Sequence, residues 1–269
     1  MIKANFHTHT TFCDGKNTPE EMVRAAIQLG MTAIGFSGHS YSEYETYGMQ
    51  PDVCAAYRAE VTRLKDKYAG QITILLGIEQ DATSDPLDYP YDYVIGSIHG
   101  IPKNRQYLCV DYSEAAMVDA VENYYNNDYY AYVEDYYRTL ADTVLKHDPT
   151  FIGHFDLVTK FNEGGKYFDE SHPRYQKAAL DALEFLISAG KPFEINTGAI
   201  SRGYRSTPYP APFILKKIQG FGGKIILSSD AHAVDGLLCG YEKATELAKI
   251  CGFTTAMTLT LDGLQEIPL

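Results

Sequence analysis

The sequence is short of positive charge, and this deficit limits the partners that the protein can have. Its 269 residues include 23 Lys and Arg against 35 Asp and Glu, which gives a formal net charge of −12. Nucleic acids and anionic membranes require a basic surface, so we expect neither as a partner. A small anionic substrate is still compatible with this charge, because bound divalent cations make a site locally positive.

Cysteine is scarce as well, and long apolar runs are missing. The five cysteines are odd in number and none follows the C-x-x-C spacing, which excludes a disulfide framework or a Cys-ligated zinc site. No segment approaches the ~20 apolar residues of a membrane span, and the N-terminal MIKANFHTHT lacks the apolar run of a secretory signal. We therefore expect reduced thiols and a cytoplasmic protein, while the sequence leaves the oligomeric state open.

Short apolar runs that end in polar residues recur along the chain and alternate with helical patterns. The seven runs predicted as strands are residues 2–6, 32–37, 72–78, 93–98, 151–153, 192–195 and 224–227. The helices predicted between them are 19–29, 52–68, 175–189, 212–220 and 241–251. Strands that are apolar on both faces indicate a parallel sheet buried between helices. Polar residues after every strand favour a closed α/β barrel over an open sheet.

A long insertion, residues 100–146, interrupts this alternation and holds many of the 22 tyrosines. Four of these tyrosines recur at helical spacing: Tyr125, Tyr129, Tyr132 and Tyr136. This spacing predicts an amphipathic helix that docks by aromatic burial, and a wall or lid over a pocket is the functional alternative. We expect one barrel domain over residues 1–269, with a Tyr-rich helical insertion at about 100–146.

Six of the eight histidines stand just after predicted strands: His7, His9, His39, His99, His154 and His232. A lone histidine is usually structural, but six with the same placement predict a shared site. Neutral imidazole is a common ligand of divalent transition metals. The H-x-H pair at 7–9 points both rings to the same side of an extended backbone, and the D-x-H at 230–232 repeats this geometry. His147 and His172 fall outside the pattern, and we expect both to be structural or exposed.

Four carboxylates complete the candidate site: Asp14, Glu79, Glu194 and Asp230. Glu79 ends an apolar strand, where an unpaired charge is costly to desolvate and a metal supplies the missing positive charge. Oxygen ligands mixed with imidazoles suit zinc, manganese or iron, and the candidates outnumber the roughly four ligands of one site. We therefore expect two or three metals. Such centres activate water and bind phosphoryl oxygens, which predicts a phosphoesterase in which a metal-bridging hydroxide attacks phosphorus.

These residues resemble the polymerase-and-histidinol-phosphatase (PHP) superfamily. The motifs that carry the resemblance follow in chain order: F-H-T-H-T with C-D-G (6–15), S-G-H-S (37–40), G-I-E-Q-D (77–81), G-S-I-H-G (96–100), G-H-F-D (153–156), E-I-N-T-G (194–198) and S-S-D-A-H (228–232). Together they run through nearly the whole chain. The length and the tyrosine-bearing insertion are similar to the stand-alone histidinol-phosphate phosphatase branch.

The resemblance implies a distorted (β/α)7 TIM-like barrel with a trinuclear metal site at the C-terminal ends of the strands. The ligand sets that it implies are His7, His9, Glu79 and Asp230 for one metal, Glu79, His99 and His154 for a second, and Asp14, His39 and His232 for a third. The reaction that it implies is hydrolysis of the phosphate monoester L-histidinol phosphate to L-histidinol and phosphate, in histidine biosynthesis.

Cations near the strand ends are the candidates for binding the substrate phosphate. Lys160 follows the fifth strand and Arg202 the sixth, and a guanidinium can bind two phosphoryl oxygens at once. Ser201 would add a hydroxyl, and Arg205 is a weaker candidate that also fits a surface charge.

Two further roles are assigned to carboxylates and a histidine. Glu194 lies outside the implied ligand sets, and we expect it to recognise the substrate amine or to support a metal ligand from behind. Asp230 or His232 is the candidate acid for the leaving alkoxide, with a metal-bound water as the alternative.

Two other functions stay open at this stage. One is a PHP phosphoesterase with another substrate, such as a phosphotyrosine protein or a nucleotide. A protein substrate favours an open, shallow site, and a nucleic-acid substrate needs a basic track. The other is a non-catalytic metal-binding module, against which the full set of ligands argues.

Overall fold

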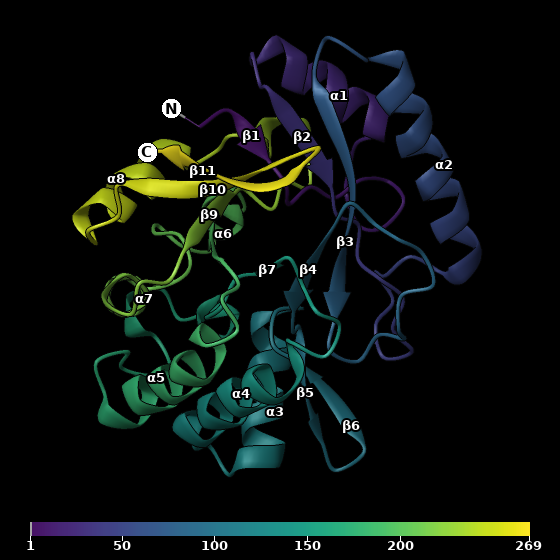
Figure 1. Ribbon diagram of the computed structural model, residues 1–269. Helices are drawn as coiled ribbons and strands as arrows, with labels where there is room; N and C mark the ends of the chain where they lie inside the picture. The colour runs from purple at the N-terminus through teal and green to yellow at the C-terminus, as the bar shows by residue number, and fades with distance from the viewer. Residues whose placement is uncertain (1) are drawn as a thin grey trace.

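The computed structural model describes residues 2–269 and contains seven short parallel strands that lie side by side, with helices outside them (Figure 1). In sheet order these strands are β1 (Ala4–Asn5), β2 (Ala33–Phe36), β3 (Thr73–Asp81), β4 (Tyr93–Ser97), β7 (Phe151–Ile152), β8 (Phe193–Asn196) and β9 (Ile225–Ser228). Each predicted apolar run holds one of them. Every neighbouring pair is parallel, as the apolar character of both faces predicts.

The first and last of these strands meet just beyond their C-terminal ends. Thr8 and Ala231 form a parallel bridge there. The amide of His9 donates to the carbonyl of Ala231 at 2.9 Å, and the amide of Ala231 donates to the carbonyl of His7 at 3.0 Å. This seam joins β1 to the end of β9, so the expected TIM-like α/β barrel is confirmed in a distorted form.

The five predicted helices are present with nearly the predicted bounds: α1 (Pro19–Gln28), α2 (Pro51–Lys67), α5 (Pro173–Ile187), α7 (Pro212–Gly220) and α8 (Tyr241–Ile250). Helix α1 begins with a capping box, in which Thr18 and Glu21 each accept a hydrogen bond from the other's backbone amide. Its buried face includes Met22, Val23 and Ala26, whereas Leu29 just beyond its end is 46% exposed. Shorter helical turns follow the strands: η1 (Leu157–Thr159), η2 (Glu163–Gly165), α6 (Gly198–Ser201) and η3 (Val234–Gly236).

The insertion is helical only in its second part. It starts with a hairpin of β5 (Gly100–Lys103) and β6 (Gln106–Cys109), whose turn residues Asn104 and Arg105 have positive φ. Helices α3 (Glu114–Tyr125) and α4 (Tyr129–Thr143) follow. Asn126, with φ of 52°, ends α3, so the spaced tyrosines lie on two helices rather than one. The hairpin was not predicted, because its strands are only four residues long and contain proline and lysine.

The tyrosines of the insertion dock it onto the barrel, as the helical spacing predicts. Tyr132, Tyr136 and Tyr137 are at most 1% exposed, and they pack in the same apolar cluster as Phe155 and Tyr175. Helices α4 and α5 lie side by side below the strands in Figure 1. Burial of these aromatic rings stabilises the packing of the insertion against the barrel.

A second hairpin, at the C-terminus, was also not predicted. Its strands are β10 (Thr255–Thr260) and β11 (Gly263–Pro268). Strand β10 adds to the outer side of β9 through Met257 and Ile226, and β11 pairs with β10 in antiparallel register. The Asp262-Gly263 dipeptide in the turn is a known hairpin signal and could have identified this hairpin.

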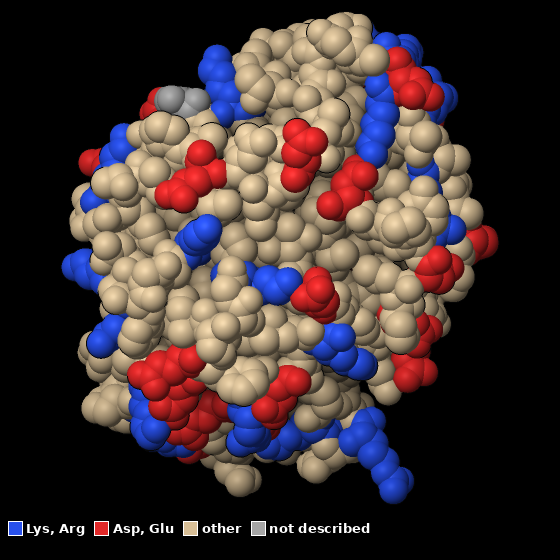
Figure 2. Space-filling view, in the orientation of Figure 1, with Lys and Arg blue, Asp and Glu red and all other residues tan. Residues whose placement is uncertain are grey.

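The outer surface carries charge of both signs. Figure 2 shows acidic and basic side chains interspersed on one face, with acidic ones gathered near α5 and no continuous basic track on this face. Within residues 2–269 no helix is long and apolar enough to cross a membrane. The five cysteines are free thiols over the same range, as expected.

A buried tyrosine fills the interior of the barrel. The hydroxyl of Tyr93 lies between two backbone carbonyls that can accept its one hydrogen, that of Phe6 at 2.7 Å and that of Phe36 at 3.0 Å. Its ring fits against the strands only because Gly35 and Gly77 face it, since a Cβ at either position would overlap the ring. The glycine of the G-I-E motif therefore makes room for the core directly beneath the site.

We expect Gly77→Ala to lower the free energy of unfolding by about 1–3 kcal/mol, because the added methyl forces Tyr93 out of its place. Chemical denaturation followed by circular dichroism measures this change. Gly220→Ala is the matched control, because no heavy atom of the described chain lies within 4 Å of a Cβ there. Equal stability of the two variants would contradict the packing role of Gly77.

Candidate metal centre

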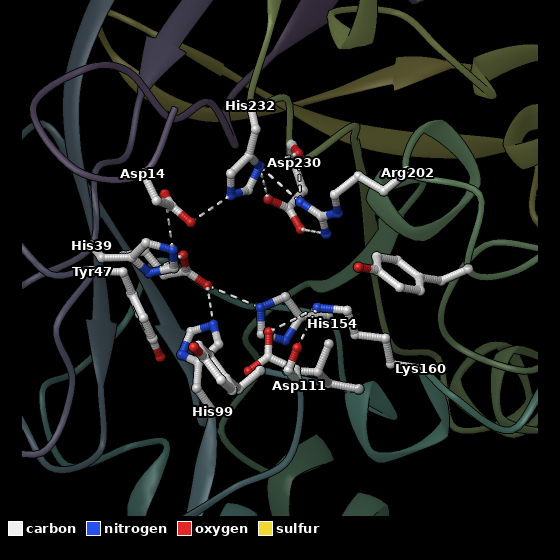
Figure 3. A pocket seen from close by; sticks show the side chains of 14 residues that line it. Asp14, His39, Tyr47, His99, Asp111, His154, Lys160, Arg202, Asp230 and His232 are labelled. Atoms are coloured by element: carbon white, nitrogen blue, oxygen red, sulfur yellow. Dashed lines mark hydrogen bonds and ion pairs between the residues drawn. The ribbon is translucent and has the colours of Figure 1, made fainter. Parts of the chain in front are cut away.

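The histidines that follow the strands converge at the mouth of the barrel. Figure 3 shows four of them around the pocket: His39, His99, His154 and His232. Glu79 is 1% exposed and stands near the end of β3. Its two carboxylate oxygens lie close to a ring nitrogen of five histidines: His7 (3.1 Å), His9 (3.4 Å), His39 (3.0 Å), His99 (3.4 Å) and His154 (2.9 Å). Glu79 is thus the hub of the cluster.

Asp14, Asp230 and His232 extend the cluster on the side of the barrel seam. His9 Nε2 lies 3.3 Å from Asp230 Oδ1, and His232 Nε2 lies 3.1 Å from Asp14 Oδ2. The rings of His39 and His232 each stack with the ring of His9, with centroids 4.3 and 4.2 Å away. All nine predicted metal ligands therefore come together, while His147 and His172 lie outside the cluster.

Ligand atoms that approach within 4.8 Å of one another form overlapping groups. Four of the groups are His9, Asp14, His39 and His232; His7, His9 and Asp230; His7, Glu79 and His154; and His39, Glu79 and His99. The first group contains the whole of one implied ligand set, with His9 added. Each of the other two implied sets draws its members from two of the other three groups, and both sets include Glu79. The assignment of each ligand to a particular metal stays a prediction.

The polar atoms at the centre lack partners, which fits a cation. Nε2 of His7, Nε2 of His9 and Oε2 of Glu79 are buried and form no hydrogen bond with any group in residues 2–269. His7 Nε2 and Glu79 Oε2 lie 3.1 Å apart without hydrogen-bond geometry, and buried polar atoms left in this state are costly. A divalent transition metal satisfies both kinds of atom at once, since both are its ordinary ligands.

The electrostatics of the cluster support the same conclusion. Burial acts to raise the pKa of Glu79, but positive charge on His7, His39 and His99 outweighs it and holds that pKa well below its usual range. Burial acts to lower the pKa of His7, but the carboxylates of Glu194 and Glu79 raise it well above its ordinary value. The carboxylates thus demand positive charge, which protons supply in the metal-free protein.

Glu194 supports the cluster from behind and does not reach the pocket. It is fully buried, its Oε1 lies 2.6 Å from Nδ1 of His7, and its Oε2 accepts a hydrogen bond from the amide of His154 at 2.8 Å. Ser228 also donates to it, at 2.6 Å. The expectation that Glu194 contacts the substrate amine is therefore corrected, while the alternative, that it orients a metal ligand, agrees with this geometry.

Asp81 supports the ring of His99 in the same way, and it was not among the predicted site residues. Its Oδ2 lies 3.2 Å from Nδ1 of His99 and accepts a hydrogen bond from the backbone amide of His99 at 2.9 Å. Tyr107 of the β5–β6 hairpin donates to it as well. The signal was present in the G-I-E-Q-D motif, because residues two apart on a strand point to the same face.

Arg202 lines the pocket, whereas Ser201 and Arg205 do not. Arg202 donates to Asp230 Oδ2 at 2.9 Å, and its Nη1 lies 2.7 Å from Nδ1 of His232 (Figure 3). Ser201 is exposed and donates to the carbonyl of Gly198, which corrects its assignment as a substrate contact. Arg205 turns away and pairs with Glu170 at 3.2 Å.

The pocket beside the cluster has a volume of about 310 Å³ and a second wall, of which the sequence predicted only Lys160. This wall, which we call the far wall, consists of Asp111, Tyr112, Leu157, Lys160 and Tyr204. Lys160 Nζ donates to the backbone carbonyl of Asp111 at 2.7 Å and lies 3.2 Å from its carboxylate. The insertion therefore reaches the pocket through the loop after β6, and the tyrosines of α3 and α4 do not line it.

Known proteins resemble this chain over most of its length. Residues 5–198 match the family model described as the PHP domain. The histidinol-phosphatase of Bacillus subtilis is 27% identical over 91% of this chain and 99% of its own length. A Schizosaccharomyces pombe protein named "Probable histidinol-phosphatase" is also 27% identical, over 93% of this chain and 87% of its own length.

A solved structure shares the fold. The histidinol phosphate phosphatase of Lactococcus lactis, complexed with zinc, L-histidinol and phosphate, superposes with a TM-score of 0.70 at 23% identity. The match covers 98% of this chain and 99% of that one. The barrel described above is therefore a known architecture.

Metal analysis of two variants tests the central place of Glu79. We expect the wild-type protein, reconstituted with manganese or zinc, to hold more than one metal per chain, because the ligand groups overlap without coinciding. Glu79→Ala should lose most of that metal, since Glu79 joins the groups, and Asp14→Ala should lose only the part at the rim.

Plasma mass spectrometry after gel filtration measures the content, with Glu242→Ala on the exposed side of α8 as the control. A full complement of metal in Glu79→Ala would show that Glu79 does not join the ligand groups.

Metal binding should release protons at neutral pH. The pKa of His7, His39 and His99 is raised in the metal-free protein, so these rings hold protons that a metal must displace. His9 contributes none, because burial and the neighbouring His232 and His39 lower its pKa to about 3. The metal affinity should therefore fall as the pH falls.

Titration calorimetry in two buffers of different ionisation enthalpy counts the released protons. His7→Gln should release fewer than the wild type. Binding without any proton release at pH 7 would contradict the charge distribution described above.

Proposed function

The chain belongs to the PHP domain family, and on that basis we propose that it is a metal-dependent phosphomonoesterase that hydrolyses L-histidinol phosphate to L-histidinol and phosphate. The observation that carries the proposal is the position of Glu79 among five histidines, beside a pocket that also presents Lys160 and Arg202. The relatives named histidinol-phosphatase support the choice of substrate.

We propose that the metals are zinc, manganese or iron and that two or three of them bind. The ligand sets would be His7, His9, Glu79 and Asp230; Glu79, His99 and His154; and Asp14, His39 and His232. When bound, these metals would activate a water molecule and offset the negative charge of the phosphoryl oxygens. The protein's own part is to hold the imidazoles in place through Glu194 and Asp81.

Lys160 and Arg202 are the groups that we propose for the phosphate. Both line the pocket, on the side away from Glu79, so a phosphoryl group could lie between them and the cluster. Arg202 is already bound to Asp230, and it therefore also fixes that carboxylate for its role in the cluster.

We propose that a water molecule in the pocket, rather than Asp230 or His232, protonates the leaving alkoxide. Burial acts to raise the pKa of Asp230, but Arg202 and His7 outweigh it and hold that pKa well below its usual range. A carboxyl that stays ionised has no proton to give. Nδ1 of His232 lies 2.7 Å from the guanidinium of Arg202, which only donates, and its Nε2 would be a metal ligand beside Asp14.

The shape and charge of the protein favour a small substrate. A pocket of about 310 Å³ accommodates a compact phosphate monoester but not the surface of a folded phosphoprotein. The net charge of −12 argues against a nucleic acid. We further propose that residues 1–269 act as one barrel domain with an insertion at 100–146, in histidine biosynthesis in the cytoplasm.

Phosphate release from three substrates tests the proposal: L-histidinol phosphate, p-nitrophenyl phosphate and a phosphotyrosyl peptide. With manganese-loaded protein we expect a clear preference in kcat/KM for L-histidinol phosphate, and loss of that activity with a chelator. Chelator-sensitive release from the other substrates alone would keep the metal chemistry and refute the substrate. Release from none, with metal bound, would support a non-catalytic module instead.

A further inference from the structure

We propose that Asp111 is the residue that selects a substrate with a positively charged amine in its leaving group. This inference rests on the proposed function, because it assigns the second half of the same pocket. The metal cluster accounts for the phosphate and the transferred oxygen, but not for the alcohol to which the phosphate is attached. The far wall is the part of the pocket that the leaving group would meet.

Asp111 stands on the loop between β6 and α3 and lines the pocket beside His99 and His154. Figure 3 shows its side chain in the pocket, beside Lys160 and below His154. The Asp111 side chain is 20% exposed, and the far wall has no other carboxylate among the described residues. Burial acts to raise the pKa of Asp111, but Lys160 and His99 outweigh it and lower that pKa to about 2, so the group is ionised. An ionised, half-buried carboxylate that faces a pocket attracts a cation.

The pairing with Lys160 leaves room for such a cation. Lys160 Nζ is closer to the carbonyl oxygen of Asp111, at 2.7 Å, than to its carboxylate, at 3.2 Å. Among residues 2–269, the other carboxylate oxygen has only the weak thiol donor of Cys109, at 3.4 Å. A carboxylate has about four acceptor positions, so several stay available to an ammonium group.

Lys160 keeps a free donor in the same way. Its ammonium has three N–H groups, and two partners are present, both on Asp111. The pair thus presents one negative and one positive group side by side. An aminoalkyl phosphate has the matching pattern, because its phosphate and its ammonium are separated by only a few bonds. A phosphate ester whose alkyl group carries no ammonium could bind Lys160 through its phosphate, but it would offer no cation to Asp111.

The rest of the far wall suits a flat ring. Tyr112, Leu157 and Tyr204 surround the charged pair, and Lys160 Nζ lies 5.0 Å from the centroid of the Tyr204 ring. Aromatic and aliphatic side chains pack against a planar heterocycle. The wall therefore combines a site for an ammonium with a surface for a ring, which are the two features of histidinol.

A pair of substrates that differ only in the amine tests the role of Asp111. We expect the wild-type protein to favour L-histidinol phosphate over 3-(imidazol-4-yl)propyl phosphate by about 10- to 100-fold in kcat/KM, the usual range for a hydrogen bond to a charged group. Asp111→Asn should reduce that ratio to near one. Asp262→Asn, in the exposed turn between β10 and β11, makes the same change of charge away from the pocket and should keep the wild-type ratio.

The ratio separates recognition from mere structural support. If Asp111 only positioned Lys160, its substitution would slow both substrates alike and keep the ratio, which would overturn the inference. Should Asp111→Asn fail to fold, inhibition of the wild-type protein by L-histidinol and by 3-(imidazol-4-yl)propanol gives the same comparison. Equal inhibition by the two alcohols would also refute it.

Failure of the proposed function is a distinct result. If L-histidinol phosphate is not hydrolysed, phosphoethanolamine and ethyl phosphate replace the pair, since they too differ by one amine. A ratio that depends on Asp111 in this second pair would support the inference, although L-histidinol phosphate would be refuted as the substrate. A ratio that Asp111→Asn leaves unchanged in this second pair would overturn the inference.

Discussion

A carboxylate buried at the mouth of the barrel is the constraint on which the rest of the site depends. Glu79 is nearly inaccessible to solvent, and its charge is stabilised only by the nitrogens arranged around it. No single neighbour offsets the cost of desolvation, so the strands must bring several imidazoles to one point. The barrel does this because the C-terminal ends of all its parallel strands meet at one rim.

The supporting residues show how that arrangement is kept. Glu194 on β8 and Asp81 on β3 each bind the outer nitrogen of a histidine on another strand or loop. The orientation of an imidazole is thereby fixed from the side opposite to its metal-facing nitrogen. Beneath them, Tyr93 fills the barrel and binds two backbone carbonyls, so the rim rests on a packed interior rather than on loops alone.

The sequence predicted the barrel and the metal ligands well, because both follow local rules. Apolar runs and N-terminal caps identify strands and helices, and a histidine after a strand has a known position in a parallel barrel. The far wall followed no such rule. Asp111 lies in a loop after an unpredicted hairpin, and only tertiary packing of α3 and α4 carries it to the pocket. The expected contact of Glu194 with the substrate fails for a related reason. The sequence places Glu194 near a strand end, but it does not show that His7 lies between Glu194 and the pocket.

The seam between the first and last strands has a consequence for folding. The bridge of Thr8 with Ala231 lies between the flanking ligands His7 and His9 on one strand and Asp230 on the other. These ligands are distant in the sequence, so no local segment of the chain can bring them together. Closure of the barrel and completion of this part of the metal site are therefore a single folding event.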